Sequence, residues 1–266
     1  MNRPDIKSPD ELTPELSRAL HDLILSLADS KRIMGIRYSD WVLGAPELEA
    51  SIAASSLAQD EWGHSRILYA LLKDFGENPQ AIEHERDREQ YCNIEALDSP
   101  LETWPEFVVT NAIVDGALTE QLEALGDSRY ATLRQRVQKQ LEEERFHQGH
   151  AAAWLARLGT TSDATRGAVQ AALDARWGAV LHWFGPDEFG AGGTADGLWE
   201  RAGGELRQRF MQRLVALIER CGLNVPEVKL DFSDWDATSR RKSRGGPDED
   251  AVARARGDRS RAMLLD

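Results

Sequence analysis

Two short motifs in this sequence place a carboxylate and an imidazole three residues apart. They are Asp60-Glu61-Trp62-Gly63-His64 and Glu143-Glu144-Arg145-Phe146-His147. On a helix this spacing puts both side chains on one face, one turn apart, so each motif can offer a metal ion one oxygen and one nitrogen. Two such helices, with a carboxylate from each of two further helices, form the ligand set of a dimetal centre in a four-helix bundle.

The motifs interrupt helix faces that are otherwise apolar. The face that carries Glu61 and His64 also holds Ala53, Leu57, Ala58, Leu68 and Leu72. Asp115 interrupts the apolar face of another expected helix. Because an unpaired Glu or His is unfavourable to bury, these groups need a metal or a hydrogen-bonded ion as partner. We therefore predict Glu61, His64, Glu144 and His147 as catalytic metal ligands and Asp115 as a further ligand.

Mixed carboxylate and imidazole ligands without cysteine favour iron over zinc. The sequence thus predicts two iron ions, with manganese as the alternative. Asp60 and Glu143 each precede a predicted ligand histidine by four residues and could accept its second ring N–H, although a solvent-facing acid fits either position equally well. His150 could reach the same pocket from one turn beyond His147, and a place at its rim fits the sequence better.

The first helix must supply the remaining carboxylate. Asp22 and Asp29 are the acids near the expected position, and Asp29 is the favoured metal ligand. Lys31 is a competing occupant of the same helix face. If Lys31 points inward, the metal site is altered or incomplete.

Apolar residues recur at the helical period along most of the chain, and no alternating strand pattern is present. The ranges expected to be helical are 13–38, a helix ending near Gly76, 89–97, 105–126, 129–158, 162–184 and 198–221. Thr13 is expected to cap the first of these helices, with Pro14 in its first turn. The sequence predicts an all-α fold, a four-helix bundle with additional C-terminal helices. Residues 1–12 are expected to form a flexible arm, 13–230 the helical domain, and 231–266 a charged, disordered tail.

Composition narrows the class of protein further. With 266 residues, 41% of them hydrophobic, the chain is long enough to bury a large core. The net charge of -13 argues against nucleic acid as a partner, since that binding depends on neutralising phosphates. No apolar run is long enough for a membrane span or a secretion signal, and two cysteines are too few for a disulfide framework. A cytoplasmic protein without a membrane or nucleic-acid partner is expected.

Two stretches resemble the ferritin-like family of phenylacetic acid catabolic proteins, which includes the catalytic and structural subunits of bacterial phenylacetyl-CoA epoxidase. One is Tyr38-Ser39-Asp40-Trp41 followed by residues 44–49, and the other is Arg145-Phe146-His147 followed by residues 154–159. The similarity extends over about residues 16–230. These stretches resemble the structural subunit more closely, whereas Glu61, His64, Asp115, Glu144 and His147 match the ligand pattern of the catalytic subunit.

The resemblance implies an oxidoreductase: a diiron monooxygenase that takes O2 as co-substrate and acts on a small organic molecule, with acyl-CoA thioesters as the implied class. Its electrons are expected from an external reductase, and it is expected to form a homo- or hetero-oligomer with ferritin-like subunits. The alternative is a non-catalytic structural subunit of a multicomponent oxygenase. A third possibility is a ferroxidase or a manganese-binding protein.

Overall fold

Helices and connecting loops make up the described part of this computed structural model, which comprises residues 4–242, 244–258 and 260. No β-strand occurs among these residues, so the predicted all-α, ferritin-like fold class is confirmed. In the same residues, no helix combines the length and the apolar composition that a bilayer span requires. The described residues divide into two units, each named after two of its helices: an α1–α2 unit, residues 8–100, 244–258 and 260, and an α5–α6 unit, residues 4–7 and 101–242. Each unit is described by itself.

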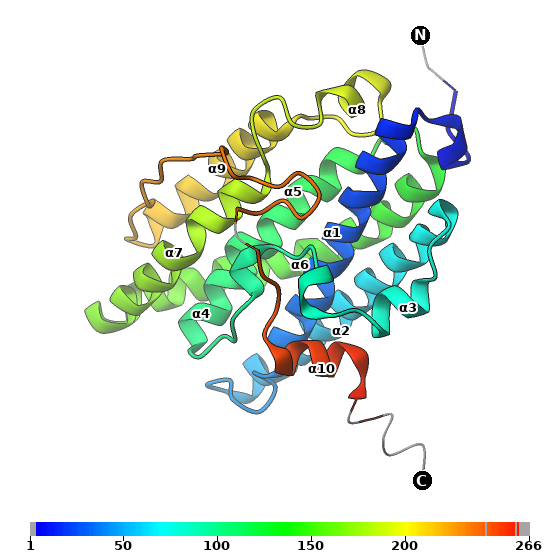
Figure 1. Ribbon diagram of the computed structural model, residues 1–266. Coiled ribbons are helices and arrows are strands. Elements are labelled where there is room, and N and C mark those ends of the chain that lie inside the picture. Colours follow the sequence, from blue (N-terminus) through cyan, green and yellow to red (C-terminus); the bar gives the residue numbers. More distant parts are fainter. Residues whose placement is uncertain (1–3, 243, 259, 261–266) are drawn as a thin grey trace. The chain divides into compact units, whose positions relative to one another are not determined.

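A helical hairpin forms the core of the α1–α2 unit (Figure 1). Its helices are α1 (Pro14–Ser39) and α2 (Leu48–Leu71), followed by the short helix α3 (Pro79–His84). The Thr13 hydroxyl accepts a hydrogen bond from the backbone of Leu16 at 3.3 Å, and Pro14 occupies the first helical turn, as predicted. A 3-10 turn extends α2 to Phe75, and Gly76 at φ 86° ends it in the left-handed conformation.

Residues 244–258 and 260 also belong to this unit, in a region where we expected a disordered tail. Of the tail expected at 231–266, residues 243, 259 and 261–266 lie outside the described part. Residues Glu249–Arg256 form helix α10, which packs against α1 and α3 (Figure 1). Asp248 caps its first turn, and Ala251, Val252 and Ala255 are buried on one face. We missed this helix because the segment is rich in charged residues overall. A helix places its charged and apolar residues on opposite faces, and composition alone does not show that separation.

The α5–α6 unit is built on one long interrupted helix beside another long helix. Its elements are α4 (Trp104–Val109), η5 (Thr110–Asp115), α5 (Gly116–Leu125), α6 (Ala131–Thr161), α7 (Asp163–Trp183), α8 (Ala191–Asp196) and α9 (Gly203–Arg220). The first three follow one another without a break, and η5 is π-helical. The predicted helices at 105–126, 129–158 and 162–184 agree with the structure within about three residues. The helix predicted at 198–221 begins five residues before α9, and α8 was not predicted. The helical period could not reveal the π-helical turn.

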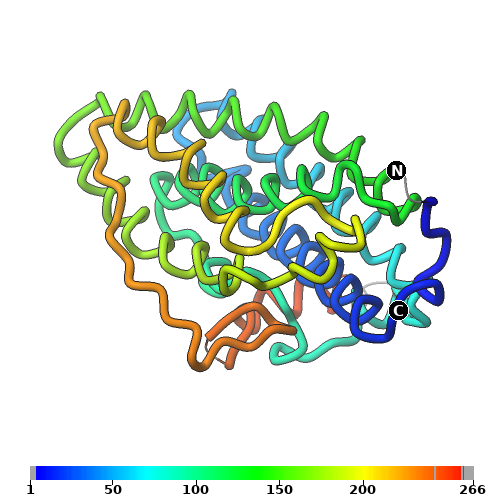
Figure 2. Tube along the Cα trace, turned by 90° about the horizontal axis from the view of Figure 1, so that it is seen from above, coloured from blue at the N-terminus to red at the C-terminus, as the bar shows by residue number. Residues whose placement is uncertain are grey.

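The two ends of this unit are extended rather than helical. Ile6, in the expected flexible arm, is buried and exchanges backbone hydrogen bonds with Arg129 and Ala131. After α9 the chain runs on without helical turns, drawn in orange in Figure 2. Gln170 and His182 of α7 hydrogen-bond the backbone of Asn224 and Asp231, respectively, and hold this segment along α7.

At Gly159, α6 packs closely against the backbone of Cys221. A Cβ atom there would lie 2.3 Å from the carbonyl oxygen of Cys221, which is backbone and cannot rotate away. Gly149, on the same helix, has no atom within 4 Å of its hypothetical Cβ. We expect Gly159→Ala to lower the free energy of unfolding by about 1–3 kcal/mol through overpacking. We expect Gly149→Ala to raise it by up to about 1 kcal/mol through helix propensity. Denaturant unfolding of both variants measures the difference, and equal effects would contradict the close packing.

Candidate metal centre

Three of the predicted ligands meet inside the α5–α6 unit. Glu144 and His147 lie one turn apart on the buried face of α6, and Asp115 is the last residue of η5. Each of the three offers a ligand atom within 4.8 Å of those of the other two. Their exposed fractions are 1% or less, so water does not screen the charges. All three are buried, as expected from their positions on apolar helix faces, and their role as metal ligands stays a prediction.

Hydrogen bonds fix the orientation of each of these groups. Nδ1 of His147 lies 2.9 Å from Oδ2 of Asp115 and 3.8 Å from Oε2 of Glu144. The Thr119 hydroxyl lies 2.8 Å from Oε2 of Glu144, and Asn111 donates to Asp115 at 3.3 Å. A hydroxyl and an amide that orient ligating carboxylates are typical supports of a metal site.

Sequence reasoning missed both supporting residues. Thr119 and Asn111 lie four residues after and before Asp115, so the helical period places all three on one face. This four-residue spacing could have identified both residues from the sequence. The π-helical turn that ends at Asp115 is the kind of local irregularity often found at functional sites.

Glu61 and His64 lie on the buried face of α2 in the α1–α2 unit. Nζ of Lys31 on α1 lies 3.1 Å from both carboxylate oxygens of Glu61, and both side chains are fully buried. Asp29 and Lys31 were the two residues considered for the ligand position on the first helix. Lys31 is the one that contacts a predicted ligand, Glu61. That Glu61 and His64 serve the same metals as the α6 motif stays a prediction.

Asp29 belongs to a different cluster, which differs from the metal role that the sequence favoured. Arg86 donates to both of its carboxylate oxygens, Tyr69 donates at 2.6 Å, and the backbone N–H of Cys92 donates at 2.7 Å. Burial, followed by the negative charge of Asp29, raises the pKa of Tyr69 well above its ordinary value, so the phenol remains a donor. Asp29 is thus an anion compensated by Arg86, and no sequence pattern linked residues 57 positions apart.

His150 lies beside the α6 motif and is half-buried. Its Nδ1 is 3.1 Å from Oδ1 of Asn111, and its ring packs edge-on against Phe107. Burial, and then the charge of His147, lowers the pKa of His150 from 6.5 to about 4. His150 is therefore neutral at physiological pH. Asp60 and Glu143 are also half-buried, and their support of the ligand histidines stays a prediction.

This lowered pKa makes stability depend on pH. Between pH 6.5 and about 4 the unfolded chain binds more protons at His150 than the folded chain, so stability falls as the pH falls through this window. We expect wild type to lose stability faster than His150→Gln there, by at most about 1.4 kcal/mol per pH unit and by less after solvent screening. Thermal unfolding at a series of pH values measures the difference, and parallel curves would contradict it.

The donor chemistry of the α5–α6 cluster fits a hard or borderline divalent ion. Two carboxylates and one imidazole are ligands that suit iron or manganese. Asp115 and Glu144 are two carboxyl groups buried close together, and burying both in the ionised form is unfavourable without a compensating positive charge. A metal ion supplies that charge, so the residues present fit the group that the sequence predicted.

The chain is similar to known proteins along most of its length. The model of the family described as phenylacetic acid catabolic protein matches residues 1–240. Two subunits of the 1,2-phenylacetyl-CoA epoxidase of Escherichia coli strain K12 are similar to the chain. The first is 29% identical over 199 residues, which cover 73% of this chain and 64% of that protein. The second is 25% identical over 205 residues, which cover 76% of this chain and 82% of that protein. The chain thus spans slightly less than two thirds of the first relative.

Proposed function

The chain belongs to the phenylacetic acid catabolic protein family, and on this basis we propose that it is a dimetal, O2-activating oxygenase component of a multicomponent system. The observation that carries the proposal is the buried cluster of Asp115, Glu144 and His147. A purely structural subunit has no need to bury two carboxylates so close together. The proposed ligands are these three residues with Glu61 and His64, the last two assigned from the sequence.

The chain's own residues would hold and shield the metals. Thr119 holds the Glu144 carboxylate, and Asp115 holds the His147 ring, so both ligands are oriented before a metal arrives. The complete burial of the cluster keeps bulk water away from the reacting atoms. When bound, reduced iron supplies the activation of dioxygen, which no side chain can perform.

The proposed substrate is a small organic molecule, and an acyl-CoA thioester is the class that the names of the relatives support. Both relatives are subunits of one epoxidase, which supports a second ferritin-like chain as partner. We propose that a separate reductase supplies the electrons, since the sequence carries no cofactor motif for this purpose.

A second candidate, a non-catalytic structural subunit, is kept because of the buried pair of Lys31 and Glu61. An ammonium group 3.1 Å from both oxygens of Glu61 compensates the charge that a metal would otherwise compensate. In a structural subunit this ion pair would keep the α1–α2 unit folded without metal. The two candidates therefore differ in metal content.

Elemental analysis after anaerobic loading with Fe(II), combined with O2-dependent visible absorbance, tests the proposal. We expect wild type to retain iron after gel filtration and to change its absorbance with O2, and we expect Glu144→Ala to do neither. Thr160→Ala, at an exposed position on α6, is the control and should behave as wild type. Absence of iron in wild type would overturn the proposal and favour the structural candidate. Iron oxidation without oxygen transfer to any organic substrate would indicate a ferroxidase.

A further inference from the structure

The side chain of Asn111 lies between a proposed metal ligand and a histidine that has no role in the proposed function. Its Nδ2 lies 3.3 Å from Oδ2 of Asp115, and its Oδ1 lies 3.1 Å from Nδ1 of His150. The first two residues belong to η5, and His150 lies on α6, one turn after His147. Two hydrogen bonds in a row therefore lead from α6 through Asn111 to the carboxylate of Asp115.

The chemistry of these groups fixes the direction of both hydrogen bonds. An ionised carboxylate only accepts hydrogen bonds, so Asn111 must present the N–H side of its amide to Asp115. The amide oxygen then faces His150 and can only accept, so the proton of the neutral imidazole lies on Nδ1. Burial keeps the imidazole neutral, because it lowers the pKa of His150 to about 4. The hydrogen bond with Asn111 thus selects one tautomer of His150.

The imidazole of His150 makes no other hydrogen bond within the described residues. Its Nε2 is buried and has no hydrogen-bond partner there. The ring packs edge-on against Phe107, with ring centroids 6.2 Å apart, and its centroid lies 6.5 Å from that of the Trp154 ring. Packing of this kind restricts rotation of the imidazole, so His150 can hold the amide of Asn111 in one orientation.

We propose that His150 is a positioning residue of the metal centre and that it acts through Asn111. The Nδ1–H of His150 holds the amide oxygen of Asn111, and the amide N–H holds Oδ2 of Asp115. The same carboxylate oxygen lies 2.9 Å from Nδ1 of His147. Asn111 is 2% exposed, so without His150 its amide oxygen would be buried without a partner, which favours rotation of the amide away from Asp115. Asp115 would then be less well oriented to bind a metal ion. This role of His150 rests on the proposed metal centre.

Titration of the metal-free, full-length protein with Co(II) tests the role. Co(II) is the probe because its visible absorption reports both binding and the geometry of its ligands. His150→Phe removes the N–H and keeps an aromatic ring beside Phe107. We expect it to weaken Co(II) binding by at least about tenfold and to change the absorption of the bound ion. His150→Asn retains an N–H near the position of Nδ1 and should restore most of the affinity.

A double-mutant cycle shows whether His150 acts through Asn111. Asn111→Leu alone should weaken Co(II) binding by at least about tenfold, and adding His150→Phe to it should cause no further loss. The nitrogen chemical shifts of the imidazole provide a readout that needs no metal. They should place the proton of His150 on Nδ1 in wild type, and this preference should be lost in Asn111→Leu.

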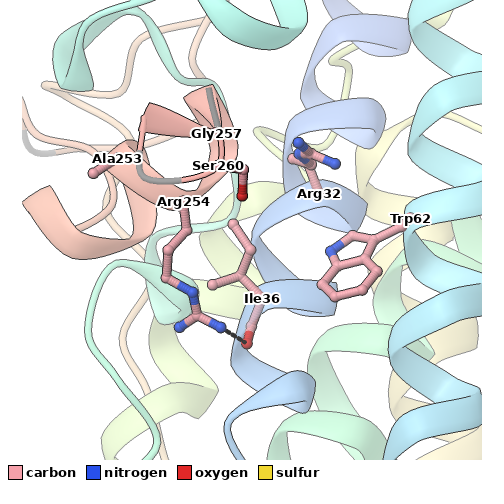
Figure 3. Close-up of a pocket in the computed structure, with 7 residues that line it drawn as sticks. All are labelled: Arg32, Ile36, Trp62, Ala253, Arg254, Gly257 and Ser260. Carbon is pink, nitrogen blue, oxygen red and sulfur yellow. Dashed lines mark hydrogen bonds between the residues drawn. The ribbon is translucent and has the colours of Figure 1, made fainter. Parts of the chain in front are cut away.

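His182 on α7 is the matched control in the same unit. It is half-buried, its Nδ1 lies 2.7 Å from the carbonyl oxygen of Gly178, and its ring packs edge-on against Phe232. His182→Phe should bind Co(II) as wild type does. In the α1–α2 unit, Arg254→Gln removes a hydrogen bond to the carbonyl oxygen of Ile36 (Figure 3) and should also leave Co(II) binding unchanged. Circular dichroism shows whether each variant is folded.

The possible outcomes separate this role from the metal centre itself. Equal Co(II) binding by wild type and His150→Phe would overturn the positioning role and leave the metal centre standing. Additive losses in the double variant, or a proton on Nε2 of His150 in wild type, would overturn the route through Asn111. Absence of Co(II) binding in wild type would contradict the metal centre, and the role of His150 would fall with it.

Discussion

Replacing Lys31 by methionine is expected to destabilise the metal-free protein by about 3–5 kcal/mol. The substitution keeps the apolar stem and removes the ammonium group that compensates the buried carboxylate of Glu61. The same change should increase the affinity for Fe(II) or Mn(II), because a divalent ion can then take the place of the ammonium group. At a metal concentration 100 times the dissociation constant, binding would restore about 2.7 kcal/mol. Denaturant unfolding with and without metal measures both effects.

The matched control is Arg66→Met, which removes an exposed positive charge from α2. It should change the free energy of unfolding by less than about 0.5 kcal/mol. The double variant Lys31→Met/Glu61→Gln should recover most of the lost stability and should not gain from added metal. If metal does not stabilise Lys31→Met more than wild type, Glu61 is not a metal ligand and the structural candidate gains support.

Replacing Arg86 by methionine is expected to destabilise the protein about as much as Lys31→Met does. Added metal should not change this loss of stability. Arg86 compensates the charge of Asp29, which is fully buried. Burial disfavours the charged form of the guanidinium, but the attraction of Asp29 outweighs burial and raises the pKa of Arg86. Removing one partner of such a pair leaves an uncompensated buried charge, which lowers stability by about 3–5 kcal/mol. Denaturant unfolding of the variant measures this loss.

A double-mutant cycle with Asp29→Asn separates the ion pair from the packing of the arginine stem. The double variant should be more stable than Arg86→Met alone, because the buried charge is then absent. Added iron should leave the stability loss of Arg86→Met unchanged. If iron rescued this variant, Asp29 would be a metal ligand after all.

The regular features of the fold could be predicted from the sequence. Thr13 and Pro14 marked the start of α1 because capping is local chemistry within one turn. The burial of Glu61, Asp115 and Glu144 followed from their positions on apolar helix faces. What these predictions share is that they depend on residues within a few turns of one another.

The features that escaped prediction depend on contacts between distant residues. Arg86 reaches Asp29 across 57 residues, and this pairing compensates the charge of Asp29 without a metal. The alternative between Asp29 and Lys31 could not be settled from spacing, because both are fully buried and spacing does not show which distant residues each one contacts. The helix at residues 249–256 was missed because its apolar face is short and meets α1 only in the folded chain.

That late helix also has a consequence for the order in which the chain is made. The α1–α2 hairpin leaves the ribosome early, whereas α10, which completes its unit, follows only after residues 101–242. At about 5–20 residues per second, translation of that stretch takes roughly 7–30 s. During this interval the faces of α1 and α3 that α10 later covers remain uncovered. Nascent chains stalled before residue 249 should therefore be more sensitive to protease and bind chaperones longer than chains released at full length.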